Sequence, residues 1–318
     1  MSAVKKPDVA LVNQLARKYR NWDRWGAGDQ AGAVNFITPE MVMQAMSLAR
    51  RGKVFSLALP LDDTGPQKGA FGRVNPIHMM LQDGGDILSG AQDHMLNRYT
   101  DDAIFMPLQC STQWDGLAHI FHDGEMYGGH GPEVVTSRGA KRADICQQKD
   151  RMVGRGVLLD MPRCMHVPWL EHGYAIQGDE LAACAQAQGV EVRDGDTVLV
   201  RTGAIAEVRD RGSWGDYAAG PAPGLGVSTS EFLCARRVAA VATDTWGLEP
   251  QPNETTDIFQ PLHVILLVNA GMMLGEMFDL EDLAADCAQD GVYEFLLVAP
   301  PLTVTGGVGS PVNPQAIK

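Results

Sequence analysis

The sequence lacks the features that would place the chain in a membrane or a secretory pathway. No apolar stretch reaches the length of a signal peptide or a transmembrane helix, and the richest apolar run, residues 264–270, is far too short to span a bilayer. Six cysteines are dispersed without a CxxC pair, which favours free thiols in a reducing compartment. We therefore expect a soluble, cytoplasmic protein.

Positive charge is also scarce. Only 26 Lys and Arg stand against 39 Asp and Glu, so the formal net charge is -13. An acidic surface repels phosphate backbones and anionic lipids, and we expect neither a nucleic acid nor a membrane partner. With 45% hydrophobic residues the composition is that of an ordinary globular chain, which leaves a small-molecule substrate as the expected partner.

Four common catalytic signatures are missing. The chain has no GxSxG nucleophile elbow, no Walker A loop, no HExxH metal motif and no GxGxxG between a strand and a helix. The Gly-rich segment 306–310 has no helix after it, so it predicts a turn near the site rather than a phosphate cradle.

The secondary-structure patterns are short and mixed. Helical spacing and capping residues predict helices at 8–20, 39–52, 179–188, 228–237, 263–270 and 279–287, with Thr38 as the N-cap of the second. Short apolar or alternating runs predict strands at 54–61, 156–160, 197–201, 238–243, 272–276, 292–300 and 302–304. The polar, Met-rich segment 62–103 predicts a long surface excursion. Since the strands do not alternate regularly with long helices, we predict a mixed α/β domain rather than a doubly wound parallel sheet.

Groups able to hold a divalent cation are concentrated between residues 109 and 122. Gln109, Gln113 and Asp115 offer oxygens, while His119 and His122 offer imidazole nitrogens. Gln113 and Asp115 are two residues apart, so on a strand both point to the same side. Such a donor set suits Zn2+ or Mn2+. A polar strand and loop with locally hydrogen-bonded histidines is the alternative interpretation.

Two further segments carry polar groups at the ends of predicted elements. His263 begins a helix and Glu276 ends a short strand, and the pair can close round the first cluster in the fold. A helix-capping histidine and an exposed glutamate are the alternatives. Asp244-Thr245-Trp246 follows an apolar strand, where polar residues line a site or form a turn.

Residues 109–119 resemble the signature of the putative cyclase family, which includes bacterial kynurenine formamidases and isatin hydrolases. That signature reads His-x-Gly-Thr-His-x-Asp-x-x-x-His, and Thr112, Asp115 and His119 match it at the right spacing. Glutamine replaces its first two histidines, and the resulting Thr-Gln-Trp-Asp form resembles a long-chain branch of the family. Further similar segments cover most of the chain: 154–160, 195–203, 263–276 and 301–314.

The resemblance implies a fold and an assembly. The expected fold is α/β, with a mixed β-sheet or barrel-like core and surrounding helices, of the swivelling β/β/α type. It implies one hydrolase domain over residues 1–318, with a helical and loop extension at about 1–53. A homodimer or homotetramer is the expected assembly.

The resemblance also implies a metal centre and its chemistry. Asp115 is expected to be a metal ligand able to bridge two ions, His263 and Glu276 to complete its shell, and His119 to be the general base. Gln109 and Gln113 stand where histidine ligands normally lie and are expected ligands too. The expected ion is Mn2+ or Zn2+, with Mg2+ as a further alternative. Because an amide oxygen is a weaker and harder ligand than imidazole, the two glutamines should lower Zn2+ affinity and favour Mn2+ or Mg2+, or leave one metal position empty.

The expected activity is hydrolysis of a C–N bond in a small cyclic or aryl amide. Thr112 is expected to support the oxyanion, and Trp22, Trp25, Trp114 and Trp246 to stack on a flat substrate, with core packing as the alternative for these tryptophans. Three rival functions stay open: a lactone hydrolase using the same site, a metal-dependent isomerase or dehydratase, and a non-catalytic small-molecule-binding protein that kept the fold.

Overall fold

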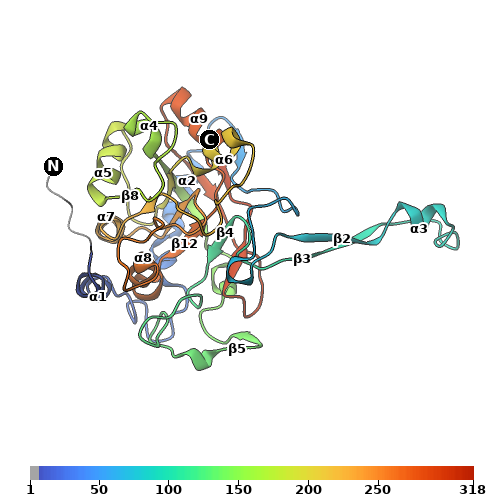
Figure 1. The fold of residues 1–318 in the computed structure, drawn as a ribbon, viewed down its shortest axis with the longest axis horizontal. Coiled ribbons are helices and arrows are strands. Elements are labelled where there is room, and N and C mark those ends of the chain that lie inside the picture. Colours follow the sequence, from blue (N-terminus) through green and yellow to red (C-terminus); the bar gives the residue numbers. More distant parts are fainter. Residues whose placement is uncertain (1–6) are drawn as a thin grey trace.

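The computed structural model describes residues 7–318 and builds them around one nine-stranded mixed sheet (Figure 1). The strands lie in the order β1-β15-β13-β7-β9-β11-β12-β4-β14. Their bounds are β1 Val54–Ser56, β4 Gln113–Asp115, β7 Val153–Asp160, β9 Thr197–Arg201, β11 Ala240–Thr243, β12 Met273–Glu276, β13 Glu294–Val298, β14 Gly309–Pro311 and β15 Gln315–Ile317. The central strands β7, β9, β11 and β12 run parallel, whereas both flanks are antiparallel.

Helices surround this sheet, so the predicted mixed α/β fold is confirmed. Their bounds are α1 Val9–Lys18, α2 Pro39–Met46, α4 Met161–Met165, α5 Gly178–Ala187, α6 Ala204–Arg211, α7 Thr229–Ala235, α8 Pro261–His263 and α9 Glu281–Asp290. Shorter helical turns are η1 Gly32–Phe36, η2 Ala70–Gly72, η3 Pro132–Val134 and η4 Ile145–Gln148, and η5 Val264–Ala270 is π-helical. Thr38 caps α2 as predicted, because its side chain accepts a hydrogen bond from the backbone N–H of Met41. No helix among residues 7–318 is long and apolar enough to cross a membrane.

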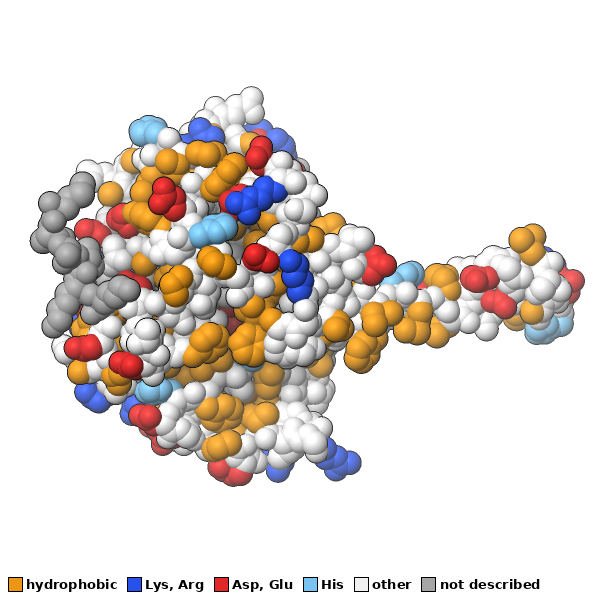
Figure 2. All heavy atoms as spheres, in the orientation of Figure 1, with side chains coloured by type: hydrophobic (Ala, Val, Ile, Leu, Met, Phe, Trp, Pro, Cys, Tyr) orange, Lys and Arg blue, Asp and Glu red, His pale blue; other side chains and the backbone are white. Residues whose placement is uncertain are grey.

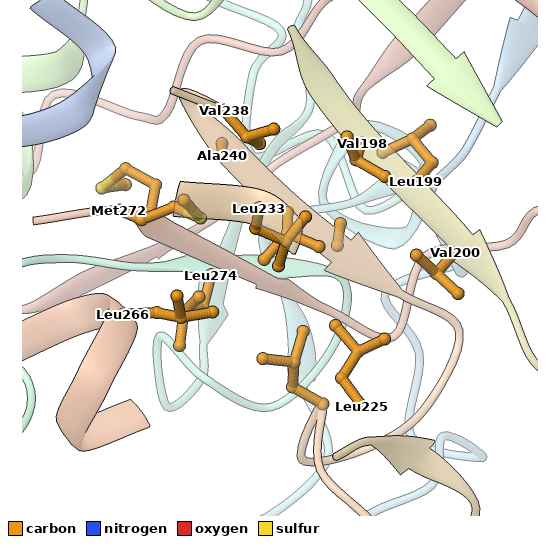
Figure 3. Packing of buried hydrophobic residues seen from close by; sticks show 14 of the residues in the cluster. Val198, Leu199, Val200, Leu225, Leu233, Val238, Ala240, Leu266, Met272 and Leu274 are labelled. Atoms are coloured by element: carbon orange, nitrogen blue, oxygen red, sulfur yellow. The ribbon is translucent and has the colours of Figure 1, made fainter. Parts of the chain in front are cut away.

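The core lies where the parallel strands are covered on both faces. Val198, Leu199 and Val200 on β9 are all fully buried, although successive side chains on a strand point to opposite faces. Figure 3 shows these side chains together with Leu274 of β12 and Leu266 of η5. A continuous apolar run is the expected pattern for a strand buried on both faces.

The N-terminal segment packs on this body. Residues 1–6 of the predicted extension lie outside the described residues. In the remainder, α1 buries Val12, Leu15 and Ala16 in the main hydrophobic core, and Asp8 caps the helix by accepting a hydrogen bond from the N–H of Leu11.

Some predicted boundaries are wrong. The second helix ends at Met46 instead of Gly52, the strand predicted at 54–61 ends at Ser56, and residues 302–304 form no strand. In the turn that follows them, the Val304 carbonyl accepts a hydrogen bond from the backbone N–H of Gly307. Pro300 and Pro301 come directly before residues 302–304 and have no backbone N–H to donate to a neighbouring strand. This explains why strand pairing resumes only at β14 and β15.

The predicted surface excursion contains a regular hairpin that was not predicted. Strands β2 Ile77–Gln82 and β3 Asp101–Phe105 form a two-stranded ribbon with α3 Gly84–Leu88 near its tip. We call residues 77–105 the arm, which projects far from the body (Figure 1) and carries apolar side chains along its stalk (Figure 2). The remaining strand pairs are small: β5 Val135–Thr136 with β6 Gly139–Ala140, and β8 Ala175–Ile176 with β10 Gly224–Leu225.

Candidate metal centre

Three side chains from distant parts of the chain converge beneath one edge of the sheet. Asp115 ends β4, Glu276 ends the neighbouring strand β12, and His263 ends α8. One potential ligand atom from each lies within 4.8 Å of the others. The Nε2 atom of His263 is 3.8 Å from Asp115 Oδ2 and 3.6 Å from Glu276 Oε1. The predicted convergence of these three residues is therefore present, and all three are buried.

A third acid, Glu249, fixes the direction of the His263 ring. Its Oε1 lies 2.7 Å from His263 Nδ1 and also accepts the backbone N–H of His263. Its Oε2 accepts the N–H of Leu262. A carboxylate can only accept here, so Nδ1 carries a proton and Nε2 is the ring nitrogen that faces Asp115 and Glu276. This carboxylate–imidazole pairing is the usual support of a metal-ligating histidine.

Burial shifts the pKa values of the groups in this centre. Burial, together with the adjacent charge of Asp115, raises the pKa of Glu276 to about 7. Burial alone would lower the pKa of His263, but its hydrogen bond to Glu249 and the neighbouring carboxylate of Glu276 raise it to about 10. Two neighbouring buried carboxylates are costly unless a cation, either a proton or a metal, lies between them.

The residues fit a divalent metal. Two carboxylates and one imidazole form a donor set that Zn2+ and Mn2+ both accept. The Oε1 atom of Gln113 is buried without a hydrogen-bond partner, and its Nε2 donates to Asp115 Oδ1 at 3.2 Å and to Glu276 Oε2 at 2.8 Å. The predicted ligand Gln113 therefore bridges both carboxylates through its amide nitrogen, and its buried oxygen is left without a partner.

Gln109 and His119 lie at the wall of the same centre. Gln109 lines the adjoining cavity and packs so close to Gly309 that a Cβ there would meet its Nε2 at 2.5 Å. Among residues 7–318, however, no hydrogen bond joins Gln109 to the three converging residues. His119 Nε2 is 3.8 Å from Asp115 Oδ1, and burial lowers the pKa of His119. Its imidazole is consequently neutral at neutral pH and able to accept a proton.

A cavity of about 400 Å³ opens above these groups. Its apolar wall is formed by Phe71, Pro107, Ile120, Trp246 and Phe259. Its polar lining comprises Arg73, Gln109, Asp115, His119, Gln260, His263 and Glu276. A cavity that combines an apolar wall with converging polar groups is a usual form of a small-molecule site.

Of the predicted substrate contacts, Trp246 alone lines this cavity. Trp114 lies between Gln113 and Asp115 on β4, so it points to the opposite face, where it is fully buried and donates to the Ala299 carbonyl. Thr112 is not available to an oxyanion, because it accepts the Leu59 N–H and donates to the Met277 carbonyl.

Trp22 and Trp25 also lie outside the cavity. The Trp22 indole donates to the Val268 carbonyl, and Trp25 packs edge-on against Phe36. His122, the remaining histidine of the first cluster, is hydrogen-bonded to Asn13 instead of the metal candidates. The two tryptophans and His122 therefore make packing and hydrogen-bond contacts within the fold, which was the alternative interpretation of the sequence.

Sequence patterns did not reveal Phe71, Arg73, Glu249, Phe259 or Gln260. Each lies in a loop or short turn without a recognisable spacing to the metal candidates. Glu249 offered the one usable signal, since it is an acid a few residues beyond the end of a predicted buried strand.

Comparisons with known proteins agree with the fold that carries this site. A family model described as putative cyclase matches residues 34–250. A crystal structure described as a novel cyclase is 38% identical, with 95% of this chain and 99% of that chain covered and a TM-score of 0.86. Isatin hydrolase A from Labrenzia aggregata, bound to benzyl benzoate, is 20% identical, with 86% and 98% covered and a TM-score of 0.60. Isatin hydrolase A from Ralstonia solanacearum is 18% identical, with 88% and 97% covered and a TM-score of 0.62. No curated protein matches the sequence.

Proposed function

The chain belongs to the putative cyclase family, and we propose that it is a metal-dependent hydrolase that opens a small cyclic amide or a related amide. The convergence of Asp115, His263 and Glu276 at a cavity with one apolar wall carries this proposal. Proteins of similar fold are described as isatin hydrolases and as a potential metal-dependent hydrolase with cyclase activity, which is consistent with it.

Asp115, His263 and Glu276 would hold the metal. When bound, such an ion supplies Lewis acidity, which lowers the pKa of a water and polarises a carbonyl group. Glu249 keeps Nε2 of His263 directed at the two carboxylates, and Gln113 restrains both carboxylates by hydrogen bonds. The chain therefore presents these ligands in a preorganised geometry.

His119 is the base of the proposed reaction. Its imidazole borders the cavity, and its lowered pKa keeps it neutral at neutral pH. It accepts the proton of the attacking water and returns it to the leaving nitrogen, which is general acid–base catalysis by one group. The rings of Trp246 and Phe71, whose centroids are 6.0 Å apart with an interplanar angle of 18°, form an apolar wall for a flat substrate body and keep water away from it.

We propose Mn2+ or Zn2+ as the ion, with Mg2+ as an alternative. A centre with two carboxylates and one histidine has fewer imidazole ligands than Zn2+ usually selects, and the nearby amide of Gln113 adds a hard oxygen.

A non-catalytic binding protein is the second candidate, and one contact favours it. The Gln113 amide donates to Asp115 and to Glu276, which partly compensates both carboxylates without any ion. Metal analysis separates the two functions, because a binding protein of this kind would leave purification without a stoichiometric metal.

The decisive experiment combines metal content with hydrolysis. The purified protein, Asp115→Asn and the control Asp216→Asn are analysed for bound metal and assayed on matched lactams and lactones. Asp216 is a suitable control because its side chain is 86% exposed. We expect metal and lactam hydrolysis in the parent and the control, and loss of both in Asp115→Asn. Full metal content in Asp115→Asn would remove Asp115 from the centre, and preference for lactones would make the protein an esterase.

A further inference from the structure

Arg73 is a cation without a protein partner at the wall of an acidic site. It follows η2 directly and lines the cavity above Asp115 and Glu276. Among residues 7–318 its guanidinium takes part in no ion pair and no side-chain hydrogen bond, in contrast to Arg155 and Arg201, which are each bound by two acids. A half-buried arginine with free donors is available to a ligand.

The surrounding turn directs Arg73 into the cavity. Phe71 has φ 54°, a left-handed conformation that is unfavourable for a residue with a bulky side chain, and Gly72 follows with φ 73°. The turn is closed by hydrogen bonds between the backbones of Gly69 and Arg73 and of Ala70 and Arg73. As a result, Phe71 and Arg73, two residues apart, both line the cavity.

Trp246 holds the guanidinium in position. The Cζ atom of Arg73 lies 5.0 Å from the centre of the Trp246 ring, within the range of a cation–π contact. Trp246 is itself anchored, since its indole N–H donates to Gln67 Oε1 at 3.2 Å. Stacking on an aromatic face leaves the in-plane N–H groups of arginine free to bind a second partner.

We propose that Arg73 binds a carboxylate of the substrate, so that the substrate class is a flat, apolar amide bearing one anionic carboxylate apart from the scissile bond. This inference rests on the proposed hydrolase function for the scissile bond, but not for the binding of the carboxylate. The apolar body lies against the wall that Phe71, Trp246 and Phe259 form, and the carboxylate meets the planar fork of the guanidinium.

The charge of the cavity favours a carboxylate over a phosphate. Asp115 and Glu276 repel anions, and Arg73 is the one Lys or Arg among the lining residues. A single guanidinium matches one planar, singly charged carboxylate through two parallel hydrogen bonds. A doubly charged phosphate would require further positive groups that this wall does not offer.

Binding of matched probes tests the proposal without reference to catalysis. We would titrate 1-naphthoate and its neutral counterpart 1-naphthamide into chelator-treated protein by calorimetry, so that the carboxylate cannot bind a metal instead. The variants are Arg73→Gln, Arg73→Lys and, as a control, Arg138→Gln, because Arg138 is exposed and distant in sequence from the cavity residues. Circular dichroism verifies that each variant is folded.

The expected result is selective for the charged probe. Arg73→Gln should weaken naphthoate binding about 10-fold or more, since a charge-assisted bidentate pair is lost, and leave naphthamide binding nearly unchanged. Arg73→Lys should fall in between, and Arg138→Gln should match the parent. Equal losses for both probes, or a parent protein that does not prefer naphthoate, would overturn the proposal.

Hydrolysis assays of the metal-loaded protein keep the two proposals apart. A preference for naphthoate that depends on Arg73, without hydrolysis of any amide, would sink the hydrolase function and leave the carboxylate site standing. The opposite result is that carboxylate-bearing and neutral lactams are hydrolysed with equal kcat/KM and that Arg73→Gln lowers both values equally. This result would support the hydrolase function and refute the role of Arg73.

Discussion

Glu249 and His263 form a buried pair in which the acid fixes the imidazole twice. Oε1 of Glu249 is 2.7 Å from Nδ1 of His263 and 2.8 Å from its backbone nitrogen, so ring and main chain are held by one oxygen. Both residues are almost completely buried. As a consequence, Nε2 of His263 faces the carboxylates of Asp115 and Glu276.

The first prediction concerns this pair. Glu249→Gln should lower metal affinity about 10- to 100-fold, because a neutral amide orients the ring less firmly and makes the imidazole less basic. The measurement is a metal titration against a chelating indicator, with the exposed Glu171→Gln as the control. Unchanged affinity in Glu249→Gln would mean that His263 needs no such support.

His119 is predicted to act on protons and not on metal retention. His119→Asn should reduce kcat about 100-fold or more, the usual effect of losing a general base, while metal content stays close to that of the parent. The matched control is His122→Asn, since His122 is bonded to Asn13 outside the cavity. Loss of the metal in His119→Asn would instead make His119 a ligand.

The pH dependence of kcat/KM provides a second test of His119. Burial lowers the pKa of His119 below its ordinary value of 6.5, so the base stays unprotonated further into the acid range. We expect kcat/KM to fall on the acid side only below pH 6.5, and this limb to disappear in His119→Asn. An acid limb that is identical in the variant would assign the titration to another group.

The arm is the surface on which we expect a second copy of the chain to dock. Ile77, Met79, Leu81, Ile104 and Phe105 are all substantially exposed on it, and a two-stranded ribbon is marginal in water by itself. The expected homodimer or homotetramer stays a prediction. Leu81→Lys together with Ile104→Lys should lower the mass in light scattering to that of one chain, whereas the control Leu302→Lys should not. A parent protein that is already monomeric would contradict this role.

The predictable part of the site followed from strand periodicity and the spacing of the motif. Gln113 and Asp115 lie on one side of β4 because alternate residues share a face, and Gln113 is hydrogen-bonded to Asp115 and to Glu276 on the neighbouring strand. The same rule sends Trp114 to the core, so choosing it for its aromatic ring was wrong. Buried strands such as β9 could also be predicted from the sequence, since Gly195 and Asp196 mark the turn before a continuous apolar run.

The remaining part depends on tertiary packing. Arg73 and Glu249 reach the site from a turn and a loop whose paths no local pattern encodes, and the arm is a hairpin whose strands bury almost nothing. Propensity alone cannot place such segments, because the free energy that orders them comes from contacts distant in sequence.

The ion cluster around Asp286 provides a stability prediction. Burial would raise the pKa of Asp286, but hydrogen bonds from Lys53, Lys318 and Arg51 outweigh it and lower the pKa to about 2. The unfolded carboxyl titrates near 3.9, so the contribution is complete above that pH and is lost as the pH falls through about 2. Asp286→Asn should cost about 1–2 kcal/mol at pH 6, a difference from the parent that vanishes near pH 2. Urea unfolding across this range measures it, and a difference that is constant with pH would contradict the assignment.

Cys164 and Cys184 are predicted to form a disulfide before any other pair of thiols. Their sulfur atoms are 2.7 Å apart, closer than two thiols in ordinary contact, and Cys164 is partly exposed whereas Cys184 is buried on α5. The hydrogen bond with Cys184 also lowers the pKa of Cys164, which makes it the better nucleophile.

Glutathione disulfide is a suitable oxidant for this test. The Cys164 thiolate attacks it to give a mixed disulfide and one glutathione, and Cys184 then displaces the second glutathione, so that one dithiol and one glutathione disulfide yield one protein disulfide and two glutathiones. Closing the chain between residues 164 and 184 should stabilise the fold by about 3 kcal/mol and raise Tm. Mass spectrometry of unreduced peptides should find this link in the parent and in the control Cys234→Ser, but not in Cys164→Ser. A lasting mixed disulfide on Cys164, without the internal link, would show that the two sulfur atoms do not meet in solution.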